Sequence, residues 1–98
     1  MTTGDERQAA AARIDELVAL LRRQQGTDTA KMIDECEALS RAVNAFHMEG
    51  IRFRIYNVDR QLAQHADSLP AEARALLEET RRHLEAAGFH TRSHQSPV

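Results

Sequence analysis

The sequence has little of several residue types that particular classes of protein require. It contains a single cysteine, so no disulfide can form within the chain and a disulfide-stabilised scaffold is excluded. Two prolines, four glycines and no tryptophan supply little of the turn and strand chemistry that an all-β protein uses. No apolar run approaches the roughly 20 residues that a transmembrane helix needs, so we expect no membrane partner.

Charge and length set further limits on the function. The 98 residues suffice for one domain, and 13 basic against 15 acidic side chains give a net charge of -2. This balance argues against nucleic acid as a partner, because nucleic-acid binders usually carry a basic surface. Residues 1–12 lack the apolar core of a signal peptide, and with a single cysteine this favours a cytoplasmic location.

Apolar residues recur at helical spacing along most of the chain and predict an all-α fold. The first helix is expected over about residues 5–25. The last helix is expected to begin near Leu69 or Pro70 and to end at Gly88, where Phe89 supplies the hydrophobic contact of a Schellman turn. We therefore expect one helical domain over residues 1–89 and a flexible polar tail over residues 90–98. The stripe on the first helix is Ile14, Leu17, Val18 and Leu21.

The middle of the chain carries two apolar seams that lie about 100° apart on a helical projection. Gly50 falls between them, and no proline interrupts the region. We predict one continuous helix over residues 29–66, bent at Gly50; the alternative is a break at Gly50 and a compact monomer of four helices. The first seam is Met32, Cys36, Leu39, Val43 and Phe46, and the second is Ile51, Ile55, Val58 and Leu62.

A long central helix that is apolar on two sides needs more cover than two shorter helices can give it. The expected fold is therefore an antiparallel helical bundle of three helices, or four if the chain breaks at Gly50, which a second copy of the chain completes. Two-fold symmetric dimers are the commonest oligomers of soluble proteins, so a homodimer is the expected partner.

The segment over residues 50–60 interleaves arginines with aromatic residues, a combination that favours protein interfaces. We interpret it as the dimer interface or the contact for a protein partner. The alternative is a small anionic-ligand sensor, or a small all-helical enzyme, in which Arg52 or Arg54 holds the anion and His47 or Tyr56 orients it. The candidate surface comprises Phe46, His47, Arg52, Phe53, Arg54, Tyr56, Asn57 and Arg60.

The sequence contains no motif that indicates a particular chemical reaction. The sequence contains no CxxC, HExxH, P-loop or GxSxG pattern, and Cys36 lies on an apolar seam as a buried thiol would. We therefore expect no catalytic residue, no metal and no cofactor. The sequence predicts a non-catalytic helical interaction or regulatory module that acts as a homodimer through its central helix.

Overall fold

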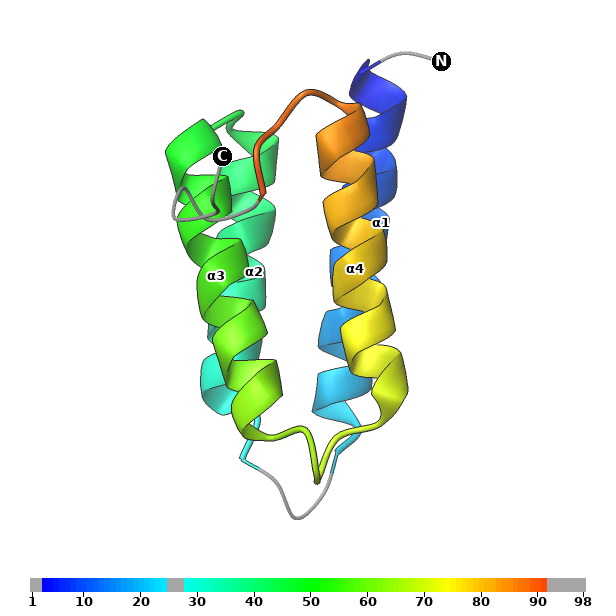
Figure 1. Cartoon of the computed structure of the whole chain (residues 1–98), viewed down its shortest axis with the longest axis vertical. Helices are drawn as coiled ribbons and strands as arrows, with labels where there is room; N and C mark the ends of the chain where they lie inside the picture. The colour runs from blue at the N-terminus through cyan, green and yellow to red at the C-terminus, as the bar shows by residue number, and fades with distance from the viewer. Residues whose placement is uncertain (1–2, 25–27, 92–98) are drawn as a thin grey trace, which may run out of the picture.

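The computed structural model describes residues 3–24 and 28–91, and this part of the chain is helical without any strand. Helix α1 packs against both α2 and α4, and α2 packs against α3 (Figure 1). Helices α3 and α4 touch each other less extensively. The radius of gyration of 12.9 Å equals the roughly 13 Å typical of a compact domain of this length. The helices are α1 (Thr3–Arg22), α2 (Ala30–Asn44), α3 (Met48–Gln64) and α4 (Ala71–Ala86).

The core consists of one apolar stripe from each helix, and both predicted seams of the middle region supply part of it. Val18 is the exception on α1, where it is only partly buried while Leu20 is buried instead. Each fully buried aliphatic side chain contributes about 1.5–3 kcal/mol relative to exposure. The buried stripes of α2 and α3 are Met32, Cys36, Leu39 and Val43, followed by Ile51, Ile55, Val58 and Leu62.

The prediction of one continuous helix over residues 29–66 is wrong. The chain reverses at residues 45–47, so that α2 and α3 are separate helices that pack against each other. Each of them needs only one buried face, which explains why the two seams lie at different angles. The break does not lie at Gly50 either, because this glycine sits in the first turn of α3.

The reversal is a Schellman turn without glycine at its left-handed position. Phe46 adopts a φ of 57°, and its N–H donates to the carbonyl of Val43 at 3.2 Å. The N–H of His47 donates to the carbonyl of Ala42 at 3.0 Å, which completes the two-bond pattern. A side chain in this backbone region costs roughly 1–2 kcal/mol, so Phe46 is strained where glycine would be relaxed.

His47 begins α3 as its N-cap. Its Nδ1 accepts a hydrogen bond from the N–H of Gly50 at 2.8 Å, which satisfies one otherwise unpaired donor of the first turn. A Cβ on residue 50 would lie 2.5 Å from that same Nδ1. Gly50 therefore leaves room for the cap and does not break the helix.

The predicted stop of α4 is confirmed. Gly88 has a φ of 96°, and the N–H of Phe89 donates to the carbonyl of Leu84 at 2.9 Å. The chain stays packed beyond this turn, because Thr91 is buried and its carbonyl accepts from Arg81 at 2.9 Å. Residues 92–98 of the expected tail lie outside the described residues. The first helix ends at Arg22, three residues before the predicted end at about residue 25.

Replacing Phe46 by alanine and by glycine separates the strain of the turn from the contacts of the ring. Both variants lose the ring, but only glycine relaxes the left-handed backbone, so Phe46→Gly should be about 1 kcal/mol more stable than Phe46→Ala in urea unfolding. At exposed Ala75 inside α4, glycine should instead cost about 1 kcal/mol relative to alanine. Equal stability of the two Phe46 variants would contradict the strained turn.

Replacing Gly50 by alanine tests whether the glycine is needed to leave room for the His47 cap. In the wild type, Gly50→Ala displaces the His47 ring, so the loss of the cap offsets the gain in helix propensity. In a His47→Ala background no ring is displaced, and the same change should be about 1 kcal/mol more favourable. Thermal or urea unfolding of the four proteins measures this coupling, and an identical effect in both backgrounds would rule it out.

Candidate interaction surface

The residues predicted for the functional surface fall into three environments, of which the first is the α2–α3 turn. The Phe46 side chain is 56% exposed, with its ring centroid 6.2 Å from that of Phe89. The guanidinium carbon of Arg7 lies 4.0 Å from the centroid of the Phe46 ring, in a cation–π contact. His47 is held in its capping bond. The Phe46 ring therefore contacts both α1 and the segment after α4, while His47 caps α3.

In the second environment, polar side chains of α3 pair with carboxylates of the same chain. Arg54 forms an ion pair with Glu35 of α2 at 3.0 Å, and the side-chain amide of Asn57 donates to the same Glu35 oxygen at 3.3 Å. Arg52 pairs instead with Glu49 at 3.4 Å. The structure does not bring Arg52 and Arg54 to a common point, because each guanidinium is directed to a different carboxylate.

The third environment is the outer ridge of α3, which faces away from the core. Phe53 and Tyr56 are 57% and 53% exposed, although aromatic rings of this size are usually covered. Arg60 is also exposed, and its guanidinium carbon lies 5.9 Å from the centroid of the Tyr56 ring. Exposed large hydrophobic side chains of the described residues all fall between positions 46 and 56.

Sequence reasoning missed one member of this ridge. Glu49 lies four residues before Phe53, and its side chain is 71% exposed. Glu49, Phe53, Tyr56 and Arg60 follow one another at spacings of four, three and four residues, which places them on one stripe of the helix. That spacing can be read in the sequence. On a continuous helix over residues 29–66, however, the two longer apolar seams dominate the pattern, and the stripe is overlooked.

The single thiol lies inside the core. Cys36 is fully buried, as expected, and burial raises the pKa of its thiol to about 12, with smaller contributions from Glu35 and Glu37. Within residues 3–24 and 28–91, no three His, Cys, Asp or Glu side chains gather closely enough to hold a metal ion. No helix of the described part has the length and apolar character needed to cross a membrane.

Comparisons of the chain with protein families, curated proteins and solved structures find no match.

The raised pKa of Cys36 predicts an inert thiol in the folded protein. At pH 8 about 1 thiol in 10,000 is ionised, so reaction with a disulfide reagent should be roughly a thousandfold slower than that of a free cysteine. Since the thiolate is the nucleophile, the rate should rise as the pH increases toward 12. Spectrophotometric labelling with and without urea measures this, and a native rate close to the unfolded rate would contradict burial.

Proposed function

We propose that the chain is a non-catalytic interaction module, an antiparallel four-helix bundle that forms a homodimer through the outer ridge of α3 (Glu49, Phe53, Tyr56 and Arg60). The observation that carries this proposal is the exposure of two aromatic rings on the same ridge, Phe53 at 57% and Tyr56 at 53%. Tyrosine, phenylalanine and arginine are enriched in protein interfaces because they combine large contact area with directed polar groups.

A second copy fits the ridge because the ridge is complementary to itself. Its four residues are symmetric about the point midway between Phe53 and Tyr56, since Glu49 and Arg60 each lie four residues further out. A two-fold axis through this point would place Phe53 against the partner's Tyr56 and Glu49 against the partner's Arg60. Acid and base lie about 16 Å apart along the helix, one at each end of the aromatic pair. This arrangement is the isologous contact that a closed dimer requires.

The charges on the ridge are available for such a contact. Arg60 has no carboxylate partner within the described residues, whereas Arg52 and Arg54 are already paired. Within the described residues, the ion pair of Glu49 is with Arg52 at 3.4 Å, three residues away, and the Glu49 side chain itself is 71% exposed. Such a surface pair is worth a few tenths of a kcal/mol and gives way to a better partner.

The contact joins two folded units and adds nothing to the core of either. One helix ridge buries less than the roughly 800 Å² per partner of a standard stable interface, so the dimer should be weak, with a dissociation constant in the micromolar range. We therefore propose a reversible association that concentration controls. A cytoplasmic location, where the buried Cys36 stays reduced, is part of the same proposal.

Charge reversal tests both the dimer and its orientation. Glu49→Arg alone and Arg60→Glu alone each set like charges against each other twice per dimer and should weaken association at least about tenfold. The double variant carrying both changes restores opposite charges across the two-fold axis and should recover most of the affinity. Phe53→Asp should abolish association. Sedimentation velocity and light scattering over a wide range of protein concentration measure these effects.

Arg82→Glu is the matched control, because Arg82 is exposed on α4 and away from the ridge. It should leave the dissociation constant unchanged, and circular dichroism should show that every variant stays helical. A wild-type protein that remains monomeric near millimolar concentration would overturn the proposal. So would a Phe53→Asp variant that dimerises as the wild type does.

A further inference from the structure

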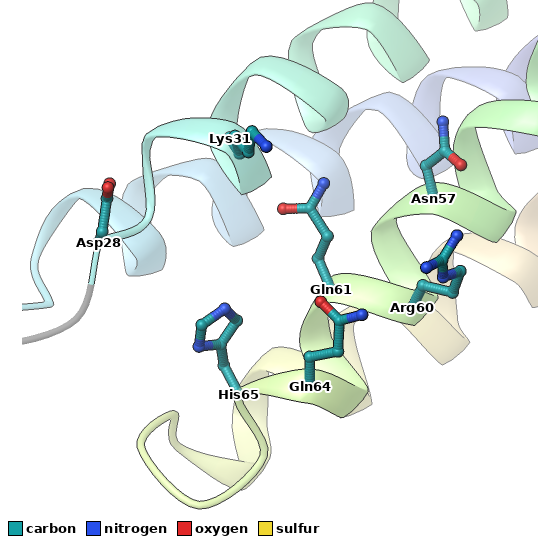
Figure 2. A pocket seen from close by; sticks show the side chains of 7 residues that line it. All are labelled: Asp28, Lys31, Asn57, Arg60, Gln61, Gln64 and His65. Carbon is teal, nitrogen blue, oxygen red and sulfur yellow. The ribbon is translucent and has the colours of Figure 1, made fainter.

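A polar groove of about 440 Å³ lies between the start of α2 and the second half of α3. Lys31 lines it from α2, Arg60 lines it from α3, and His65 lines it directly after the end of α3 (Figure 2). Its volume is within the range of small-molecule sites, about 300–1,000 Å³. Sequence reasoning grouped Arg60 with its aromatic neighbours only, because Lys31 is 29 residues away along the chain.

The groove collects positive charge that the protein does not neutralise. Neither Lys31 nor Arg60 has a carboxylate partner among the described residues, whereas six other arginines do. Asp28 is the acidic residue of the lining, and its Oδ1 accepts from the N–H of Ala30 at 3.1 Å. The lining thus carries a net charge of about +1, or about +2 when His65 is protonated.

Hydrogen-bonding groups surround these charges. Gln61 points from α3 toward Lys31 at the start of α2 (Figure 2), and neither the Gln61 nor the Gln64 amide has a hydrogen-bond partner within the described part of the chain. Each amide supplies both donors and an acceptor. The first turn of α2 already has an anionic partner in the Asp28 carboxylate, so the positive charge of the groove comes from Lys31 and Arg60.

We propose that this groove binds a small phosphate ester. A phosphate group carries up to two negative charges on three oxygens, which suits a lining whose cations are Lys31 on one helix and Arg60 on the other. Gln61 and Gln64 line the same groove, and their amides suit the hydroxyl groups of the esterified part. A single carboxylate bears only one negative charge, so it should bind the two cations more weakly than a doubly charged phosphate does.

Arg60 belongs to both the groove and the outer ridge, and this predicts a coupling between ligand and dimer. A phosphate that holds Arg60 withdraws it from the partner's Glu49, so the ester should weaken the dimer, and the dimer should weaken ester binding by the same factor. Only this coupling rests on the proposed homodimer. The site itself requires a single chain.

Titration of the ¹⁵N-labelled full chain with glycerol 3-phosphate, followed by NMR, tests the site directly. We expect saturable shifts of the Lys31 backbone amide and of the Gln61 and Gln64 side-chain amides, and none with sodium chloride at equal ionic strength. Lys31→Gln should weaken binding about tenfold, and Gln61→Glu should abolish it by placing a carboxylate in the groove. Arg82→Gln, an equal change of charge on α4, should leave the affinity unchanged.

Three results would overturn the assignment. They are the absence of saturable shifts with the ester, equal effects of Lys31→Gln and Arg82→Gln, and binding of succinate as tight as that of the ester. The Lys31→Gln variant keeps the ridge intact, and the Glu49→Arg variant keeps Lys31 and the groove amides intact. The Lys31→Gln variant therefore tests ester binding without changing the dimer contact. The Glu49→Arg variant tests dimerisation without changing Lys31 or the groove amides, so the two proposals can fail separately.

Discussion

One left-handed residue, Phe46, determines how the apolar surface of the chain is distributed. Its φ of 57° turns the chain back on itself and converts a would-be helix of two apolar faces into two helices with one buried face each. Without the reversal, neither seam could face the other across a common core. The strain at Phe46 is tolerated because the helices on either side bury eight apolar residues between them and their neighbours.

Much of the fold was predictable because burial follows helical periodicity. The stripes on α2 and α3, and the Gly88–Phe89 stop, each rest on residue types whose chemistry leaves few alternatives. The α2–α3 turn was not predictable by the same route. A Schellman turn is recognised by its glycine, and here phenylalanine occupies that position while the nearby glycine serves a different purpose. The cap is a histidine, which lies outside the usual Ser, Thr, Asp and Asn signal.

The candidate surface was predictable in position but not in its internal organisation. Composition singled out residues 50–60, and the exposed rings do lie there. Which arginines remain unpaired depends on contacts between α2 and α3, since Glu35 reaches Arg54 only after the chain has reversed. Arg60 has no such partner among residues 3–24 and 28–91, and it lies between an aromatic ridge on one side and a polar groove on the other. A single guanidinium thus borders two surfaces, which is the physical basis of the coupling that we propose between them.

The start of α1 and the end of α4 lie at the same end of the molecule, where the imidazole of His83 meets the carboxylate of Glu6 at 2.8 Å (Figure 1). A mechanical force applied at these two ends therefore acts across the α1–α4 seam and not along it. It would open the seam one turn at a time, beginning at Glu6, and each step would break only a few contacts. Helix pairs loaded along their axes must break many contacts together, so we expect this chain to resist tension between these two ends more weakly than tension along its helices.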